Sequence, residues 1–283
     1  MARQLVSFDW AMKRILREKT NFDILEGFLS ELFGFDIKIS QIIESEANQE
    51  DRENKFNRVD LLAKDDRDRL ILIELQHDSE NDYFHRMLYG TSKLISEYIK
   101  LGDSYKEVKK VYSVNIVYFG LGQGVDYLYK GAIDFRGLNR DDDKLELNSK
   151  QKELFGDIEV ADIFPEYYII KVDQFDKLSK YSSLDEWIYF LKNEEIKSDF
   201  SAKGLDKAKE KLDMMKLPES ERKIYKRALE DKRLESSLLE SAKFEGERNK
   251  AIEIAKNSLA KGLDIATVSE ITGLSIDTVE KLK

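Results

Sequence analysis

Hydrophobic and polar residues alternate along this chain with two different periods, and the changes of period divide it into predicted elements. Apolar side chains at helical spacing mark residues 8–16 and 21–33, and the second of these segments stops at Gly34. Residues 37–43 alternate weakly, as in a strand. The chain is therefore expected to open with two helices and a strand.

The next segment predicts two strands joined by a tight turn. Residues 59–64 alternate in polarity, residues 65–68 form a polar turn, and residues 70–73 are an apolar run of buried-strand type. Two carboxylates, Asp60 and Glu74, interrupt the apolar pattern. A carboxylate inside an apolar strand is costly unless a cation or a hydrogen-bond donor compensates it. At matching heights on paired strands, both carboxylates would point at one spot that suits a hard divalent cation.

The segments after this hairpin predict an α/β core. A strongly amphipathic helix spans residues 82–101, and strands are expected over residues 111–119 and 166–175. The glycine-rich segment 120–124 is followed by a further strand rather than by the helix that a nucleotide-binding loop requires, so we interpret it as a turn. A helix follows over residues 184–192. We therefore predict a mixed sheet flanked by helices.

Strand patterns stop at residue 205, and the rest of the chain is helical. Residues 219–261 carry nearly balanced charges and few apolar positions, as in an exposed helix or an oligomerisation arm. Two short apolar stripes on either side of Gly273 predict a helix-turn-helix over residues 264–283. Its second helix lacks arginine and its charges cancel, which favours a packing or partner-binding module over sequence-specific DNA reading.

Composition narrows the class of protein. The 283 residues are 41% apolar and 36% charged, as expected of a globular protein with a heavily charged surface. No apolar run is long enough to span a bilayer, and the first residues lack the apolar stretch of a signal peptide. The absence of cysteine excludes thiolate metal sites and suits a cytoplasmic location, and only two histidines argue against a His-built zinc site. The net charge of −9 argues mildly against nucleic acid as a partner, although local basic faces can override it.

The hairpin resembles the active-site hairpin of the PD-(D/E)XK nucleases. Val59-Asp60 stands where that family has Pro-Asp, and Glu74-Leu75-Gln76 stands where it has the acid-x-Lys triplet. A longer ordered set is similar to the recombination-promoting nuclease and transposase branch: FDWAMKRIL, ESEAN, NRVDLLA, IELQ, DYFHRMLYGTSKL and VYSVNIVYF. The resemblance implies a restriction-endonuclease-like α/β domain over residues 1–200. We assign residues 201–261 to a charged helical extension and residues 262–283 to the small helix-turn-helix module, an all-α addition.

The resemblance also assigns roles to individual residues. Asp60 and Glu74, with the backbone carbonyl of Leu75, are implied ligands of Mg²⁺, with Mn²⁺ as the alternative ion, and Gln76 completes the implied catalytic set. Glutamine cannot supply the positive charge of the usual lysine, but it can orient a water or bind a phosphate oxygen. The remaining candidates are accessory acids and phosphate contacts: Glu26, Glu46, Arg86 and Lys93. For Glu26, Glu46 and Lys93, an exposed structural role is the favoured alternative, as it is for His77 and His85.

Two functions follow from these observations. The first is a metal-dependent DNA endonuclease that hydrolyses phosphodiesters, requires no organic cofactor and has no membrane partner. Its C-terminal helices are candidates for self-association. The second is a non-catalytic DNA-associated or partner-binding protein that retains the nuclease fold. Gln76 separates the two, because the enzyme hypothesis weakens if a lysine is needed at this position.

Overall fold

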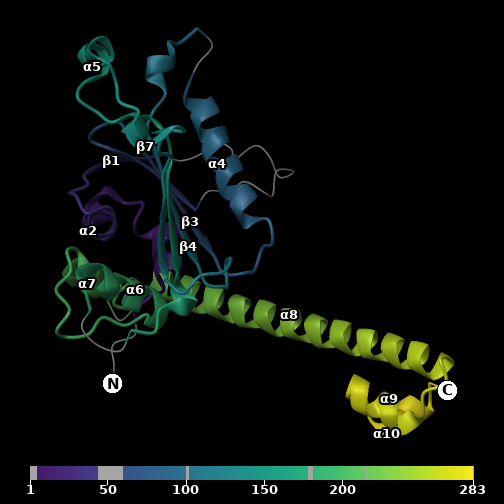
Figure 1. The fold of residues 1–283 in the computed structure, drawn as a ribbon. Coiled ribbons are helices and arrows are strands. Elements are labelled where there is room, and N and C mark those ends of the chain that lie inside the picture. Colours follow the sequence, from purple (N-terminus) through teal and green to yellow (C-terminus); the bar gives the residue numbers. More distant parts are fainter. Residues whose placement is uncertain (1–4, 44–59, 100–101, 178–180, 215, 283) are drawn as a thin grey trace. The chain divides into compact units, whose positions relative to one another are not determined.

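A computed structural model of the chain describes residues 5–43, 60–99, 102–177, 181–214 and 216–282. The chain folds into two compact units, Met1–Leu217 and Pro218–Lys283. The first unit contains a mixed sheet with helices on both faces, and the second is entirely helical (Figure 1). None of the described helices is both long enough and apolar enough to cross a membrane.

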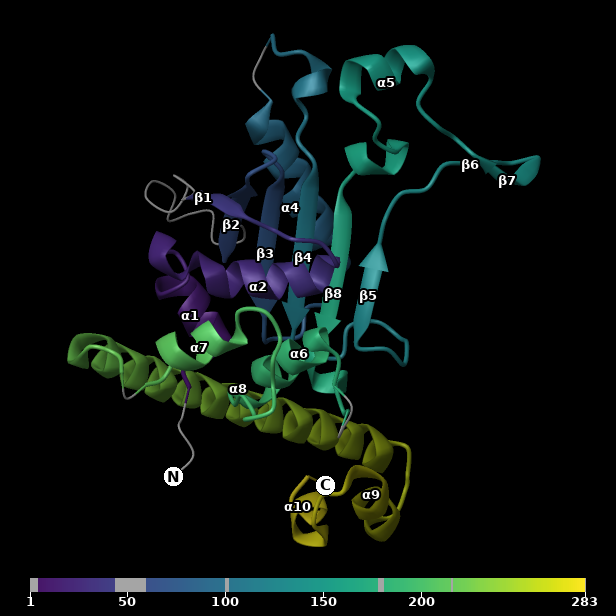
Figure 2. The same ribbon diagram turned by 90° about the vertical axis from the view of Figure 1, so that its left-hand side faces the viewer.

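The sheet of the first unit has six strands in the order β1-β2-β3-β4-β8-β5 (Figure 2). Strands β3, β4 and β8 run parallel to one another, whereas β1, β2 and β5 are antiparallel to their neighbours. Their bounds are β1 Ile39–Ile43, β2 Leu61–Asp65, β3 Leu70–Gln76, β4 Val111–Val117, β5 Leu128–Gly131 and β8 Glu166–Lys171. The central strand β4 is buried along its whole length, as its apolar sequence predicts. The predicted mixed sheet is therefore confirmed.

Helices cover the two faces of this sheet. On one face lie α1 (Phe8–Arg14), α2 (Phe22–Phe33), α6 (Ser183–Asn193) and α7 (Leu205–Lys211). Their aromatic side chains meet edge to face, with the rings of Phe28 and Trp187 5.6 Å apart. Helix α2 also needs Gly27, because a Cβ there would lie 2.2 Å from the carbonyl oxygen of Lys203.

Helix α4 (Tyr83–Tyr98) covers the opposite face of the sheet (Figure 1). Its apolar side buries Met87 and Leu94 against the sheet, and Gly90 lies directly over Leu72 and Glu74 of β3. Because side chains alternate along a strand, this is the face on which Leu72, Glu74 and Gln76 point. Helix α4 is thus placed directly against the predicted acidic site.

Several elements differ from the prediction or were not predicted. The last predicted strand ends at Lys171 and continues as a 3-10 helix, Val172–Gln174. A small sheet of β6 (Arg136–Gly137) and β7 (Arg140–Lys144) follows β5, and the short helix α5 (Ser149–Phe155) comes next. Short 3-10 helices also occur at Lys19–Asn21, Tyr105–Glu107 and Val160–Ile163.

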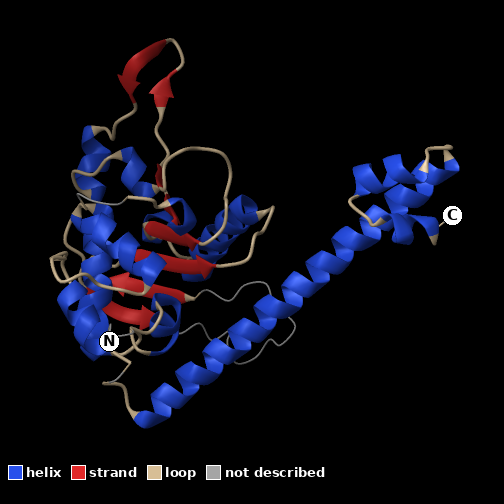
Figure 3. Ribbon diagram, turned by 90° about the horizontal axis from the view of Figure 1, so that it is seen from below, coloured by secondary structure: helices blue, strands red, loops and turns tan. Residues whose placement is uncertain are grey.

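The second unit consists of the long helix α8 (Glu219–Ala260) and the short helices α9 (Ile265–Thr272) and α10 (Ile276–Glu280), seen at the end of α8 in Figure 3. Asp264 and Ser275 cap the N-termini of α9 and α10, and Gly273 provides the left-handed turn between them with φ 70°. Ala255 of α8 packs with Val268 and Val279 in a small apolar core. The helix-turn-helix therefore packs on the last turns of α8.

Candidate active site

The β2–β3 hairpin brings Asp60 and Glu74 together. The strands are antiparallel and pair Leu61 with Ile73, so Asp60 precedes β2 at the position that faces Glu74 in the same register. The Asp60 carboxylate also accepts a hydrogen bond of 2.7 Å from the backbone N–H of Leu75. Both acids therefore lie at the end of the hairpin opposite its turn, with Glu74 under α4 and the Asp60 carboxylate close to Lys13 of α1.

Glu74 is the least compensated acid of the pair. The residue is 8% exposed, and its Oε2 atom is buried without any hydrogen-bond donor among the described residues. The nearest cation, the Nε atom of Arg86, lies 3.8 Å from Oε2. Burial raises the pKa of Glu74 to about 7, Arg86 opposes this rise, and the charges of Asp60 and Glu80 add to it. Near neutral pH, ionisation of this carboxyl group therefore costs free energy, and a bound cation would offset that cost.

Asp60 lies beside the positive charge of α1. Burial raises its pKa, and Lys13, whose Nζ atom is 3.6 Å from Oδ1, opposes that rise together with the Leu75 N–H. Lys13 is held in place by Asp9, one helical turn earlier, at 2.7 Å. The guanidinium group of Arg17 donates to the backbone carbonyl of Asp60 at 2.7 Å. Helix α1 and the residues after it thus fix both the backbone and the charge environment of Asp60.

Glu80 accepts hydrogen bonds from two residues close to the acid pair. Its Oε1 atom accepts hydrogen bonds from the Gln76 amide at 2.9 Å and from Arg86 at 2.7 Å. The Gln76 amide nitrogen also donates to the backbone carbonyl of Asp78 at 3.2 Å. Glu80 therefore orients two of the predicted site residues at once, Gln76 and Arg86.

The other predicted residues lie apart from this cluster or outside the described residues. Both carboxylate oxygens of Glu26 are used at the start of β1, where they accept from the backbone N–H of Ile39 at 2.8 Å and from Lys38 at 2.7 Å. The structure therefore does not bring Glu26 to the acid pair. Lys93 lies two turns further along α4 than Arg86 and pairs with Glu97 at 3.6 Å. Glu46 lies outside the described residues.

The two histidines differ in their surroundings. The ring of His77 stacks on Tyr118 with centroids 4.3 Å apart, and its Nε2 atom is 3.8 Å from Asp9. His77 is thus held beside the acid that holds Lys13. His85 is exposed near the start of α4.

The arrangement is compatible with a divalent cation held by few protein ligands. Among the described residues, no group of three or more His, Asp or Glu side chains is placed to hold a metal ion. Mg²⁺ is usually bound by one or two carboxylates, with water molecules as the remaining ligands, and Asp60 and Glu74 would provide two such carboxylates. The buried Oε2 atom of Glu74 is the observation in favour of a cation here, because it accepts no hydrogen bond from the described residues and Arg86 approaches it only to 3.8 Å.

Sequence reasoning missed three residues of this site: Asp9, Lys13 and Glu80. Asp9 and Lys13 are four residues apart within FDWAMKRIL, a segment that contributes to the family resemblance, so their spacing on one helix face was a usable signal. Glu80 lies in a polar loop between β3 and α4, where nothing in the sequence distinguishes it from its acidic neighbours.

The mixed sheet, the helices on its two faces and the acid-bearing hairpin define a restriction-endonuclease-like domain with a helix-turn-helix tail. Residues 6–242 match the family model of the PD-(D/E)XK nuclease family transposases, and the chain belongs to that family. Residues 248–283 match the C-terminal HTH domain of the Rpn/YhgA-like nuclease family. Both the suspected nuclease branch and the predicted helix-turn-helix are confirmed. No curated protein and no solved structure matches the chain.

Proposed function

We propose that this protein is a metal-dependent endonuclease that hydrolyses phosphodiester bonds in DNA. The observation that carries the proposal is the buried Glu74 carboxylate, which lies near Asp60 in the hairpin and whose Oε2 atom accepts no hydrogen bond from the described residues. The membership of a nuclease family supports phosphodiester hydrolysis as the reaction. The helix-turn-helix domain supports DNA as the partner, and the cysteine-free composition supports a cytoplasmic location.

Asp60 and Glu74, with the backbone carbonyl of Leu75, would hold the cation, which we take to be Mg²⁺ or Mn²⁺. When bound, a divalent cation lowers the pKa of a water and stabilises charge on a phosphate. Hydrolysis would add the oxygen of a water to phosphorus, break one phosphorus–oxygen ester bond and leave a proton on the departing oxygen. Gln76, oriented by Glu80, would direct the water or a phosphate oxygen through its amide.

Arg86 and Lys13 would supply positive charge around the reacting phosphate. Arg86 lies between Glu74 and Glu80 and has a guanidinium group suited to phosphate oxygens, and Lys93 is a weaker candidate further along the same helix. Lys13 lies beside Asp60 and brings the ammonium group that Gln76 cannot provide. The departure from the acid-x-Lys pattern is therefore compensated, in this proposal, by a lysine from α1.

Cleavage of supercoiled plasmid in the presence of Mg²⁺ tests the proposal. We expect the native chain to cut and the Asp60→Ala variant to be inactive. Lys13→Met should lower the rate by about 10²-fold, the loss typical for one charge-stabilising group, whereas Lys13→Arg should retain much of the activity. Lys207→Met, an exposed lysine on α7, is the matched control and should cut normally. If the Lys13→Met variant cuts as fast as the native chain, Lys13 has no role in hydrolysis.

The second candidate function is a non-catalytic DNA-associated or partner-binding protein with a nuclease fold. The observation in its favour is that the Gln76 amide nitrogen is already bonded to Glu80 and to the Asp78 carbonyl. Folded native protein that binds DNA through its C-terminal domain but fails to cut it with either Mg²⁺ or Mn²⁺ would favour this alternative.

A further inference from the structure

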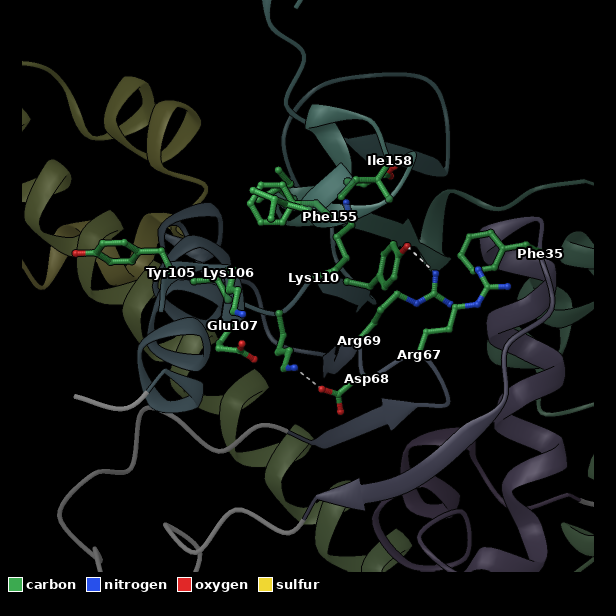
Figure 4. A pocket seen from close by; sticks show the side chains of 16 residues that line it. Phe35, Arg67, Asp68, Arg69, Tyr105, Lys106, Glu107, Lys110, Phe155 and Ile158 are labelled. Carbon is green, nitrogen blue, oxygen red and sulfur yellow. Dashed lines mark hydrogen bonds and ion pairs between the residues drawn. The ribbon is translucent and has the colours of Figure 1, made fainter. Parts of the chain in front are cut away.

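A pocket of 880 Å³ lies at the turn end of the β2–β3 hairpin (Figure 4). Its walls come from the hairpin turn around Arg67, from the segment 105–110 before β4, and from α5 together with the 3-10 helix that follows it. The volume falls in the range of small-molecule binding sites. None of the acid-pair residues lines this pocket.

The pocket is well separated from the acid pair. Arg69 of the lining precedes the first residue of β3, and Gln76 is the last residue of that strand. At 3.3 Å per residue, the strand places the two sites roughly 20 Å apart. A ligand in the pocket therefore does not occupy the candidate active site.

The charge of the pocket is positive on balance. Its lining contains five basic residues, Arg67, Arg69, Lys106, Lys109 and Lys110, and three acidic ones, Asp68, Glu107 and Asp162. Three of the basic residues already have carboxylate partners: Arg69 with Asp65, Lys109 with Asp68 and Lys110 with Glu166. Within the described part of the chain, Arg67 and Lys106 have no ion-pair partner, and both are exposed. These two cations remain available for an anionic ligand.

Flat aromatic surfaces lie next to these cations. The guanidinium group of Arg69 lies over Phe35 at 4.9 Å and over Tyr112 at 5.4 Å, and it donates to the Tyr112 hydroxyl at 3.3 Å (Figure 4). Phe155, the last residue of α5, is 43% exposed and lines the pocket beside Ile158. A planar apolar group in the pocket would find both a ring to stack on and an aliphatic wall.

We propose that this pocket binds a nucleoside phosphate, with the base against Phe155 and the phosphate at an exposed cation of the pocket wall, Lys106 on one side or Arg67 on the other (Figure 4). Aromatic faces combined with cations are the means by which proteins bind single-stranded nucleic acid and nucleotides without reading sequence. The same chemistry is offered by a free mononucleotide and by one unit of a DNA single strand. The inference does not depend on cleavage, because the pocket shares no residue with the acid pair.

Binding is measured on the full chain in EDTA, so that metal-dependent cleavage cannot contribute. The probes are deoxyadenosine monophosphate, followed by calorimetry, and a fluorescein-labelled hexamer of deoxyadenylate, followed by anisotropy. We expect saturable binding of at least one probe. The Arg67→Glu/Lys106→Glu double variant should weaken that binding at least tenfold, because it removes both exposed cations without ion-pair partners from the pocket wall and adds repulsion. Phe155→Ala should weaken it about fivefold or more, and Phe155→Tyr, which keeps a ring, should restore most of it.

The control is Lys207→Glu/Lys211→Glu, which makes the same change of charge at exposed positions of α7. If this variant loses binding as much as the pocket variant does, only the overall charge matters and the proposal fails. If the hexamer binds at least tenfold more tightly than the mononucleotide and the pocket variants weaken both, the natural ligand is a DNA strand. If the two probes bind with equal affinity, the natural ligand is a free nucleotide. If inorganic phosphate competes as well as the mononucleotide and Phe155→Ala leaves the affinity unchanged, the base does not contribute to binding and that part of the proposal is wrong. No saturable binding of either probe would overturn the proposal entirely.

Discussion

The hairpin has a buried acid on each of its strands, Asp65 and Glu74, and the two carboxylates differ in the hydrogen bonds that they accept. The side chain of Asp65 is fully buried, and its oxygens accept from the backbone N–H groups of Arg67 and Arg69 and from the Arg69 guanidinium group at 2.6–3.0 Å. Glu74 is almost as buried, but its Oε2 atom accepts no hydrogen bond from the residues that the structure describes. The hydrogen-bond requirement of Asp65 is thus met within the fold, whereas that of one Glu74 oxygen is not.

This difference shows that burial alone does not identify a site. By sequence, Glu74 interrupts an apolar strand and Asp65 opens the predicted polar turn, yet both side chains are buried in the fold. What separates them is whether the fold itself supplies the donors that a buried carboxylate requires. Substitutions of Asp65 and Glu74 are therefore expected to have different effects on cleavage and on stability.

The largest contrast is expected in DNA cleavage. Glu74→Gln should abolish Mg²⁺-dependent cleavage, because one of the two implied carboxylate ligands is lost while the side chain keeps its size. Asp65→Asn should cut at close to the native rate per folded molecule. Plasmid cleavage with circular dichroism on the same samples measures both. If the Asp65→Asn variant is folded but does not cleave DNA, the proposed difference between Asp65 and Glu74 is wrong.

Stability should show the opposite contrast, with the larger loss at Asp65. Asp65→Asn places an amide N–H₂ against the Arg69 guanidinium group and leaves that buried cation without its carboxylate. Breaking one side of a buried ion pair costs about 3 kcal/mol. Urea unfolding at pH 7 measures the loss. A change below about 0.5 kcal/mol, the scale of an ordinary surface substitution, would show that the Asp65 contacts contribute little.

Glu74→Gln should stabilise the metal-free protein, in a pH-dependent manner. The pKa of Glu74 is about 7 in the folded chain, above its ordinary value of 4.5, so the native protein loses stability as pH rises from 4.5 through 7. The variant should therefore be more stable by about 3 kcal/mol at pH 8, and the two chains should converge below pH 4.5. Thermal melts in EDTA across this range test the sign. A variant that is less stable at pH 8 would make Glu74 a structural acid.

A smaller effect is expected from Mg²⁺ on melting. A cation that binds only the folded chain raises its stability by about 1.4 kcal/mol at ten times the dissociation constant. Native protein and Asp65→Asn should both gain from Mg²⁺, whereas Glu74→Gln should not. Differential scanning fluorimetry with MgCl₂, and NaCl at matched ionic strength as the control, measures the gain. An equal response of all three chains would place the cation elsewhere.

The smallest effect is expected from removal of the tail. A chain that ends after Glu247 lacks the helix-turn-helix domain but keeps every residue of the candidate active site. Its cleavage of plasmid per molecule should stay within about twofold of native at low salt, since domain binding adds mainly affinity for DNA. Light scattering on the same chain reports whether self-association survives. If the shortened chain is folded but inactive, DNA binding by the tail is necessary for cleavage.

Local pattern was sufficient to predict the hairpin, the helices around it and the helix-turn-helix. Each is a segment whose periodicity or turn residues specify it without reference to the rest of the chain. The opposed positions of Asp60 and Glu74 also follow from local pairing, because a short turn fixes the register of a hairpin.

Contacts between distant segments could not be predicted in this way. Lys13 reaches Asp60 across 47 positions of sequence, and nothing near either residue indicates the pairing. The contacts of Glu26 could not be predicted either, because its carboxylate accepts from the backbone N–H of Ile39 at the start of β1, 13 residues further along the chain. The pocket was missed because part of its wall is the seven-residue helix α5, which is too short to produce a periodic signal.

The match to the C-terminal HTH domain begins at residue 248, inside the uninterrupted helix α8. The boundary between the two family matches thus falls within a helix rather than in a loop. A helix turns by about 100° for each residue, so the loss or gain of a single codon in the middle of α8 would rotate the tail about the helix axis by that angle. A change of seven codons would restore nearly the same direction. Length in this helix is therefore expected to vary among related genes in steps of whole turns rather than freely.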